Sequence, residues 1–298
     1  MRLLSLIFLA PLLAHGATAG RVTVSLNGDW HVGESVAAEP IPGEFGHVAP
    51  VPGLTNLAQP AFPDVDRFDS REFIQTSIRE KKLPESARVE TAGVSRQTRN
   101  YFWYRRTFTV PGRKPVAMLR VAKAQFGTAV WLNGKKVGEH LGCFTAGYFD
   151  VTSFVNWSGE NDLVIRIGAH PAALPVWAPA GTDFEKYKWT PGIYDNVSLI
   201  LTGVPYVESV QVGPRLSDSS AVVETVLVNL GSTAARTSLV QQVKPWAART
   251  LAVSLQPGER KTVWQTLPLP GAKLWTPEEP NLHWLDTASC VCQVLQKH

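Results

Sequence analysis

The sequence predicts an all-β protein made of two consecutive β-sandwiches, and three observations carry this prediction. Short apolar runs separated by turn residues recur along most of the 298 residues. Asn133-Gly134 lies between two alternating segments, a pattern typical of a tight hairpin turn. No repeat of fixed period is present, which disfavours a propeller or a solenoid. A chain of this length fits about two domains.

The composition indicates a globular protein with a sizeable core. Hydrophobic residues make up 44% of the chain and charged residues 18%. The formal net charge is +4, and the 29 basic residues form no Lys/Arg run. The sequence therefore shows no footprint of nucleic-acid binding, because such a footprint is a concentrated basic patch.

The first 19 residues are predicted to be a signal peptide. Arg2 precedes an apolar run from Leu3 to Leu13, which is shorter than the ~20 residues that span a bilayer. Small residues end this segment, so we expect cleavage between Ala19 and Gly20 and a secreted or periplasmic protein. The alternatives are a membrane anchor or an unprocessed core helix. Pro11 and the lack of a stop-transfer pattern disfavour both, so no membrane partner is expected.

The first domain is expected to span residues 20–204. Its predicted strands are Phe102–Val110, Val116–Val121, two within Ala129–His140, Leu163–Ile167 and Val197–Leu201. The segment Asp64–Thr98 is polar and charged, and we interpret it as an insertion with a short helix within Arg71–Lys82.

The second domain is expected to span residues 205–298 and to be an immunoglobulin-like β-sandwich. Its predicted strands follow at intervals close to ten residues, and a Pro257-Gly258 turn precedes the last of them. They are Val207–Leu216, Ala221–Leu230, Ser238–Val243, Arg249–Leu255 and Lys261–Leu267.

Metal, cofactor and disulfide chemistry find little support in the sequence. The seven histidines are scattered without metal-ligand spacing, and no phosphate loop or dinucleotide fingerprint occurs. We therefore expect no metal and no cofactor. Cys143, Cys290 and Cys292 remain after cleavage, and an odd number allows at most one bridge.

No residue is assigned a catalytic role. Glycoside hydrolysis needs two carboxylates about 5 to 10 Å apart across a cleft. The close pairs in sequence are Asp64/Asp66, Asp183/Glu185 and Glu278/Glu279, and we interpret each as a solvated loop pair.

Aromatic residues supply the candidate binding site. Trp103 and Trp131 lie inside predicted strands and are expected in the core. The long loop Pro171–Pro191 carries Trp177, Tyr187 and Trp189, whose flat rings suit stacking on a sugar. For this loop a binding role and a structural role stay open.

The order of motifs resembles the amino-terminal region of glycoside hydrolase family 2, the family of β-galactosidases, β-glucuronidases and β-mannosidases. The resemblance covers nearly all of residues 22–285. The motifs that carry it are Ser25-Leu26-Asn27-Gly28-Asp29-Trp30, Val51-Pro52-Gly53, Trp103-Tyr104-Arg105-Arg106-Thr107-Phe108, Val130-Trp131-Leu132-Asn133-Gly134, Val137-Gly138-Glu139-His140, Asp150-Val151-Thr152, Glu160-Asn161-Asp162-Leu163-Val164-Ile165, Gly192-Ile193-Tyr194-Asp195-Asn196-Val197 and Leu274-Trp275-Thr276-Pro277-Glu278-Glu279-Pro280-Asn281-Leu282.

The resemblance implies a jelly-roll sugar-binding domain followed by an immunoglobulin-like domain. In the family a (β/α)8 barrel comes next and supplies both catalytic glutamates. That barrel needs ~250 residues, so the glutamates match no position here. Galactosidase-like members place an acidic residue just after the strand that matches Leu163–Ile167. Gly168-Ala169-His170 stand there instead, which leaves Asp183 or the segment around Trp189 as substitutes.

Three functions follow from this reading. The first is the non-catalytic amino-terminal part of a secreted family 2 glycosidase, with a truncated second domain and a tail, 286–298, that departs from the family. The second is a stand-alone carbohydrate-binding module that uses Trp177, Asp183, Tyr187 and Trp189. The third is a docking subunit for a catalytic barrel, supplied in cis or in trans, and it predicts an apolar docking patch on the first domain. We expect no hydrolysis by this chain alone.

Overall fold

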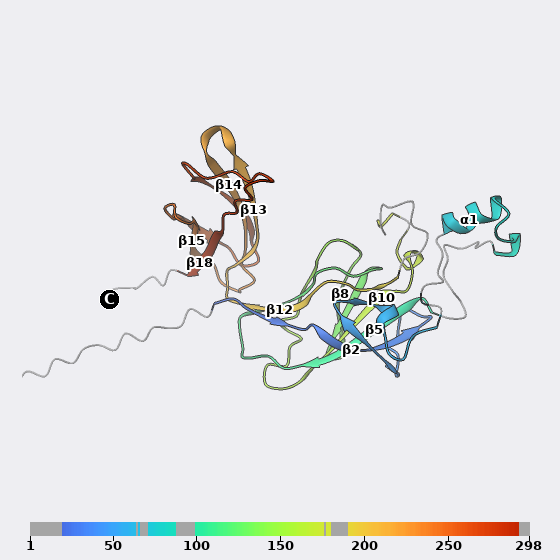
Figure 1. The fold of residues 1–298 in the computed structure, drawn as a ribbon. Helices are drawn as coiled ribbons and strands as arrows, with labels where there is room; N and C mark the ends of the chain where they lie inside the picture. The colour runs from blue at the N-terminus through green and yellow to red at the C-terminus, as the bar shows by residue number, and fades with distance from the viewer. Residues whose placement is uncertain are drawn as a thin grey trace, which may run out of the picture. The chain divides into compact units, whose positions relative to one another are not determined.

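The computed structural model describes residues 20–63, 65, 71–87, 99–175, 177–179 and 190–291. These residues divide into two compact units, and the chain passes from one to the other between Val204 and Pro205. Nearly all regular structure in both units is β-strand, in antiparallel sheets (Figure 1). The predicted all-β sandwich class is therefore confirmed. No described helix is long and apolar enough to cross a membrane.

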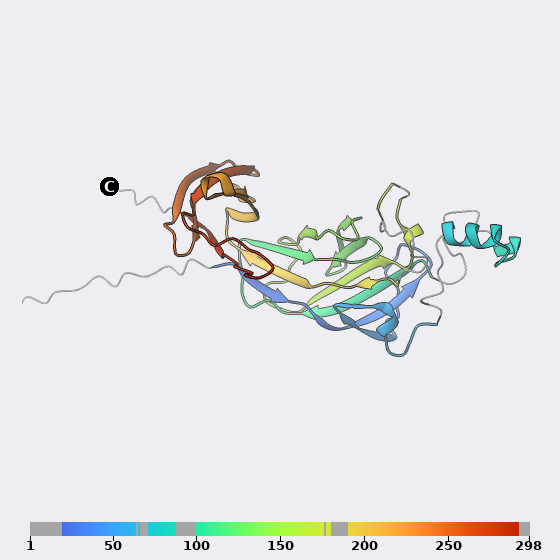
Figure 2. The ribbon, with the colours of Figure 1, turned by 45° about the horizontal axis from the view of Figure 1, so that its top comes forward.

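The first unit is a sandwich of two antiparallel sheets, which Figure 2 shows as stacked layers. One sheet has the order β1 (Val22–Ser25), β12 (Val197–Thr202), β6 (Val116–Val121) and β9 (Gly147–Asp150). The other has the order β3 (His47–Val51), β2 (Gly28–Ser35), β5 (Tyr101–Phe108), β10 (Asn161–Gly168), β7 (Thr128–Leu132) and β8 (Lys135–His140). A short pair, β4 (Gly53–Leu54) and β11 (Gly192–Ile193), accompanies them.

Strand β5 shows how alternation builds the core of the first unit. Phe102 and Tyr104 belong to the large cluster between the two sheets. Trp103 points to the opposite face, because successive side chains of a strand alternate. There it packs with Trp131 of β7 under Phe45. Trp103 is 0% exposed and Trp131 is 6% exposed, so the prediction that both are core residues is confirmed.

The predicted hairpin joins β7 to β8 at Asn133-Gly134. Both residues have positive φ, 52° for Asn133 and 77° for Gly134, as a type I′ turn demands. Asn133 also accepts a hydrogen bond from the amide of Asp162 at 2.9 Å and donates to the carbonyl of Phe154 at 2.8 Å. The turn is therefore fixed to the neighbouring strand by its own side chain.

The helix predicted within Arg71–Lys82 is α1, which spans Arg71–Arg79. It ends because Lys81 takes a left-handed conformation, with φ at 58°. The amide of Lys82 then donates to the carbonyl of Ser77 at 2.8 Å, as in a Schellman cap. Residues 64, 66–70 and 88–98 of the predicted insertion lie outside the described residues.

The second unit is a smaller sandwich of two three-stranded sheets, and Figure 1 labels four of its strands. One sheet has the order β13 (Tyr206–Arg215), β14 (Ser220–Val228) and β17 (Arg260–Pro268), and the other has the order β16 (Arg249–Leu255), β15 (Ala235–Val243) and β18 (Leu285–Val291). Two apolar clusters lie between the sheets, one around Leu227 and one around Val223.

A polar layer lies within the core of this second sandwich. The side chain of Gln241 is fully buried and donates to the Thr225 hydroxyl at 2.8 Å. Gln241 also accepts from the amide of Gln265 at 3.0 Å. Burying a primary amide is tolerated only when its hydrogen bonds are made within the protein. These bonds join the two sheets across the core and therefore help to fix how one sheet packs on the other.

Strand β18 was not among the strands expected from the sequence. Its residues on the core side include Thr287 and Ser289, so the segment lacks the apolar alternation that marks a half-buried strand. The Ser289 hydroxyl instead hydrogen-bonds the hydroxyl of Thr237 at 2.8 Å. Because its core-side residues are polar, the hydrophobic pattern did not predict this strand.

Candidate functional site

Five strands of the six-stranded sheet end together at one end of the first sandwich. The register places Ser35 beside Tyr101 and Tyr101 beside Gly168, with Thr128 beside His140 one strand further along. The loops 36–46, 141–146 and 169–191 all leave the sheet here. We call this region the loop end of the first sandwich.

A buried pair, Asn100 and His170, joins two of the segments that meet at the loop end. The His170 Nε2 atom lies 3.0 Å from the Asn100 Oδ1 atom, and the two residues are 1% and 3% exposed. The Asn100 amide donates to the carbonyl of Val36 at 2.9 Å, which leaves its Oδ1 atom as the acceptor for His170. The start of loop 169–191 is thus tied to loop 36–46 through one asparagine.

Burial keeps His170 uncharged at neutral pH. Desolvation lowers the pKa of its imidazole from 6.5 to about 4, because the charged form loses its hydration inside the protein. A neutral imidazole that donates through Nε2 fits the carbonyl oxygen of Asn100. His170 therefore acts as a neutral structural donor at this position.

The first half of loop 169–191 is anchored by a small apolar cluster. Leu174 and Ala178 of this loop pack against Phe126 and Cys143, and all four are at most 8% exposed. A Cβ atom added at Gly168 would lie 2.5 Å from Ala173 Cβ and 2.9 Å from the Phe126 carbonyl oxygen. Only glycine lets the strand end and the loop approach so closely.

The second end of the same loop is held by Gln125. The amide of Gln125 donates to the carbonyl of Gly192, and the amide of Gly192 donates back to Gln125, both at 3.0 Å. The Gln125 side chain also donates to the carbonyl of Thr190. Thr55 fixes the next residue, since its hydroxyl donates to the carbonyl of Pro191 at 2.9 Å. Contacts with the first sandwich thus anchor both ends of the loop.

One of the four predicted site residues is described, and it is a surface residue of this loop. The side chain of Trp177 is 76% exposed. Asp183, Tyr187 and Trp189 lie outside the described residues, so their placement stays a prediction.

The structure adds Phe144, which the sequence analysis did not single out. Phe144 is 57% exposed and follows Cys143, while Trp177 precedes Ala178. Because Cys143 and Ala178 belong to one cluster, both exposed aromatic residues flank it. Two exposed rings on fixed backbone suit stacking on the apolar face of a sugar. The available signal was the glycine pair Gly142 and Gly147, which marks a tight loop around Phe144.

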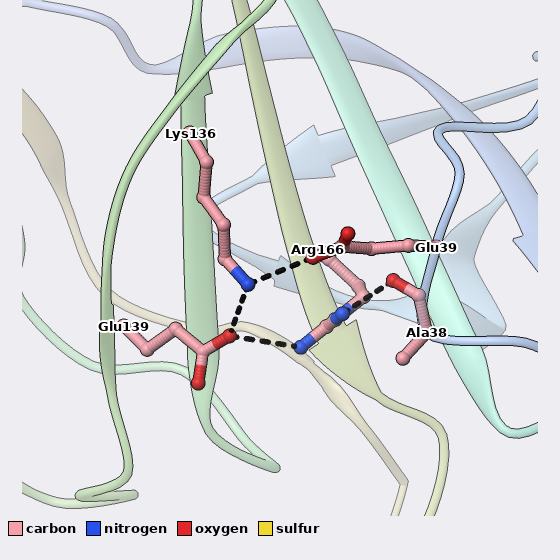
Figure 3. Close-up of polar contacts among 5 residues, drawn as sticks. All are labelled: Ala38, Glu39, Lys136, Glu139 and Arg166. Atoms are coloured by element: carbon pink, nitrogen blue, oxygen red, sulfur yellow. Dashed lines mark hydrogen bonds and ion pairs between the residues drawn. The ribbon is translucent and has the colours of Figure 1, made fainter.

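A pair of carboxylates lies close together on the outer surface of the six-stranded sheet (Figure 3). Lys136 bridges them, with its Nζ atom 2.8 Å from an oxygen of Glu39 and 2.8 Å from an oxygen of Glu139. Arg166 lies 3.6 Å from the same oxygen of Glu139 and also donates to the carbonyl of Ala38. Strands β8 and β10 and loop 36–46 supply these groups.

This carboxylate pair does not fit acid/base catalysis. A glycosidase acid has a raised pKa, because its proton must be available to the leaving group near neutral pH. The hydrogen bond and charge of Lys136 instead lower the pKa of Glu39. The salt bridges to Glu139 and Glu39 raise the pKa of Lys136 in return. We therefore interpret the cluster in Figure 3 as a structural ion network.

The other predicted carboxylate pairs supply no cleft among the described residues. Glu278 and Glu279 are exposed, as expected of a solvated pair. The pairs Asp64/Asp66 and Asp183/Glu185 lie outside the described residues. In the described part of the chain, no three His, Cys, Asp or Glu side chains are grouped as a metal ion would need.

The sequence is similar to a known family model and to curated proteins. The model of the family described as glycosyl hydrolase 2 galactose-binding domain-like matches residues 76–187. The β-galactosidase large subunit of Leuconostoc lactis is 25% identical over 160 residues, which is 52% of this chain and 24% of that protein. The β-glucuronidase of Felis catus is 22% identical over 185 residues, which is 52% of this chain and 28% of that protein.

Solved structures share the architecture over most of the chain. A GH2 β-galacturonidase from Eisenbergiella tayi superposes with a TM-score of 0.65 and 20% identity, covering 91% of this chain and 41% of that one. The β-glucuronidase of Bacteroides uniformis gives a TM-score of 0.65 and 21% identity, covering 90% of this chain and 30% of that one. At this identity the likeness establishes the fold.

The fold defines a protein of two β-sandwiches, and candidate binding residues lie at the loop end of the first sandwich. The family-model match over residues 76–187, the curated relatives and the solved structures together support an amino-terminal domain of glycoside hydrolase family 2. It spans about a quarter of the length of the curated relatives it matches, 24% and 28% for the two described above.

Proposed function

We propose that the chain is the non-catalytic, carbohydrate-binding amino-terminal part of an exported family 2 glycosidase. The observation that carries the proposal is the loop end, where Phe144 and Trp177 are exposed on backbone anchored by one cluster. Aromatic rings held on a rigid scaffold lose little entropy on binding and stack well on sugar faces. Tyr187, Trp189 and Asp183 belong to the same loop and complete the proposed site.

The relatives suggest which sugars to test first. Their names refer to β-galactosides, β-glucuronides and β-galacturonides. We expect millimolar binding of at least one of these sugars, weakened about fivefold by Trp177→Ala or Phe144→Ala, since each ring contributes roughly 1 kcal/mol. Isothermal titration calorimetry measures the affinity. Trp264→Ala, at an exposed tryptophan of the other unit, serves as the matched control.

The second measurement is hydrolysis of aryl glycosides by the same purified chain. The purified chain should release no nitrophenol from aryl β-galactosides or β-glucuronides, because the carboxylates Glu39 and Glu139 are both bound to Lys136, which lowers the pKa of Glu39. Saturable hydrolysis that survives removal of contaminating enzyme contradicts the non-catalytic role. A lack of binding across the whole sugar panel contradicts the carbohydrate-binding role.

Export is part of the proposal. Strand β1 begins at Val22, so cleavage before Gly20 leaves every described strand intact. Mass spectrometry of protein recovered from the periplasm or the medium should give a mature chain that starts at Gly20. An uncleaved chain retained inside the cell contradicts export.

A docking role for a catalytic (β/α)8 barrel, in cis or in trans, is the second candidate. Its support is a set of large apolar side chains in the segment 273–284 of the second sandwich. Leu274 is 57% exposed, Trp275 59%, Leu282 74% and Trp284 81%. Exposed apolar side chains gathered in one segment favour a protein partner. From the sequence, docking was expected through the first domain instead. Co-purification with a separately encoded barrel, lost on Trp284→Ala, tests the role.

A further inference from the structure

The second sandwich carries an exposed tryptophan on the outer face of one of its sheets. Trp264 of β17 is 60% exposed. Its neighbours along the strand belong to the interior, because Val263 packs against the cluster around Leu227 and Gln265 donates to Gln241. Successive side chains of a strand alternate between the two faces of its sheet. Trp264 therefore points outward, away from the core.

A hydrogen bond to the neighbouring strand holds the indole of Trp264 in place. Trp264 lies beside Glu224 of β14 in the register of the sheet, and its Nε1 atom donates to a Glu224 carboxylate oxygen at 3.1 Å. The only N–H group of the ring is thus occupied, and the ring offers its apolar face to a ligand. A side chain fixed before binding also loses little conformational freedom when a ligand stacks on it.

Polar side chains with unused hydrogen-bonding capacity surround this ring. Gln211 of β13 lies beside Glu224, so Gln211, Glu224 and Trp264 form one row across the three strands of the sheet. Thr262 and Thr266 lie on the same face of β17, on either side of Trp264. In the described part of the chain, the side chains of Gln211, Thr262 and Thr266 make no hydrogen bond, and Glu224 accepts one only from the indole.

The residues next to this row are small, so a ligand can lie across the strands. Gly213 of β13 lies beside Val222 of β14, and Val222 lies beside Thr266. A Cβ atom added at Gly213 would have one atom within 4 Å, the Val222 carbonyl oxygen at 3.8 Å. Two strand spacings, about 10 Å, separate β13 from β17. The row is therefore longer than a single sugar ring.

We propose that this outer face binds a neutral, linear oligosaccharide or polysaccharide across the row of Gln211, Glu224 and Trp264. One sugar ring stacks on the indole of Trp264. The hydroxyl groups of the next ring hydrogen-bond the carboxylate of Glu224 and the amide of Gln211. The site lies in the second unit, so the proposal does not depend on the sugar-binding role of the loop end.

The chemistry of the row favours a neutral sugar chain over other ligands. Sugar hydroxyl groups both donate and accept, as a carboxylate and an amide with unused capacity require. The Glu224 carboxylate repels a uronate, and the charge of Arg260 on the same strand is taken up by Glu208 at 2.7 Å. The centre of a protein interface is depleted in charged residues, whereas Glu224 lies directly beside the ring.

A single sugar is too small to use the whole row. One stacked ring strengthens binding only about fivefold, which by itself falls far short of millimolar affinity. The binding of simple glycosides therefore reports on the loop end, and Trp264→Ala leaves it unchanged. A chain of several sugars gains the stacking and the hydrogen bonds together, so its length distinguishes the two sites.

The test uses the full chain with Phe144→Ala and Trp177→Ala, which weaken the loop end and leave the outer face intact. Isothermal titration calorimetry measures its affinity for hexasaccharides of β-1,4-linked glucose, xylose, mannose or galactose. We expect at least one of them to bind with a Kd in the millimolar range or below. Adding Trp264→Ala should weaken this binding at least about fivefold. Trp264→Phe keeps an aromatic ring and should retain most of the affinity.

A pair of glutamine variants tests the polar end of the row. Gln211→Ala removes the amide and should weaken hexasaccharide binding about threefold to fivefold. Gln256→Ala, at an exposed glutamine between β16 and β17, is the matched control and should leave the affinity unchanged. The thermal midpoint of each variant shows whether the second unit is folded.

Three results overturn the proposal. The first is a chain with Phe144→Ala and Trp177→Ala that binds none of the hexasaccharides, or binds one with an affinity that survives Trp264→Ala. The second is equally tight binding of a galacturonate hexamer, which contradicts a site for neutral sugars. The third is a dimer of the unaltered chain in light scattering that becomes a monomer on Trp264→Ala, which assigns the face to a second copy of this chain.

Discussion

His170 and Asn100 are the pair of residues on which the loop end most depends. Both are buried, and their hydrogen bond joins loop 169–191 to the strand that starts at Tyr101. From the sequence, His170 was notable only because it stands where galactosidase-like members of the family carry an acidic residue. Its role became visible through Val36, which lies far away in sequence and accepts from the Asn100 side chain. A contact of this kind has no local sequence signal.

The depressed pKa of His170 predicts that acid destabilises the first sandwich. The folded-state pKa is about 4 and the unfolded value is 6.5, so the unfolded chain binds the proton first. The contribution of His170 to the free energy of unfolding is therefore complete above pH 6.5 and falls as the pH drops towards 4. Below pH 4 this group causes no further change. The loss is at most about 3 kcal/mol.

Urea unfolding at pH 7, 5.5 and 4 measures this dependence. His170→Gln retains a side-chain N–H donor for Asn100 and should flatten the dependence. The control His31→Gln alters an exposed histidine of the same unit and should leave the dependence unchanged. An unchanged pH profile in His170→Gln contradicts the assignment.

Gly168 predicts a second effect at the scale of one residue. Gly168→Ala places a Cβ atom 2.5 Å from Ala173 Cβ, so the loop must shift away from the strand end. We expect a loss of about 1–3 kcal/mol in unfolding free energy and weaker sugar binding. Gly43→Ala adds a methyl group with no atom within 4 Å and should be neutral. Equal stability of the two variants, measured by urea unfolding, contradicts the tight approach.

At the scale of elements, Arg166 of β10 holds the outer face of the six-stranded sheet together. Its guanidinium carbon lies 4.7 Å from the ring centroid of Tyr101, 5.7 Å from that of Trp103 and 5.5 Å from that of Trp131. It also binds Glu139 of β8 and the carbonyl of Ala38 (Figure 3). One planar cation thus joins three strands to loop 36–46.

Arg166→Lys should destabilise the first sandwich even though the charge is kept. An ammonium group cannot stack on three rings while also reaching two oxygen acceptors. We expect a loss of about 1–2 kcal/mol in urea unfolding. Arg260→Lys, at an exposed arginine that pairs with Glu208, is the control and should change stability by less than about 0.5 kcal/mol. Equal effects of the two substitutions contradict the role of stacking.

For the whole molecule, we predict that the two units unfold separately. Each has its own buried clusters, around Tyr104 in the first and around Leu227 and Val223 in the second. Calorimetry of the full chain should show two transitions. Residues 20–204 expressed alone should reproduce one of them within a few degrees, because their core is complete. A single transition, or an unfolded fragment, contradicts this independence.

Much of the architecture follows from local pattern. The hairpin at Asn133-Gly134 and the end of α1 depend on neighbouring residues, and strands such as β16 show plain apolar alternation. The sequence did not predict β18, whose inward residues Thr287 and Ser289 are satisfied by partners on other strands. Polar inward residues are allowed only by those distant hydrogen bonds.

The sequence by itself determined the all-β class, the order of the family motifs and the aromatic content of the loop around Trp177, because these depend on residue type and local spacing. The tertiary structure alone decided that Phe144 lies beside the same cluster as that loop, that Glu39 and Glu139 share Lys136, and that β18 pairs with β15. The physical reason is that burial, ion pairing and strand pairing join residues far apart in sequence.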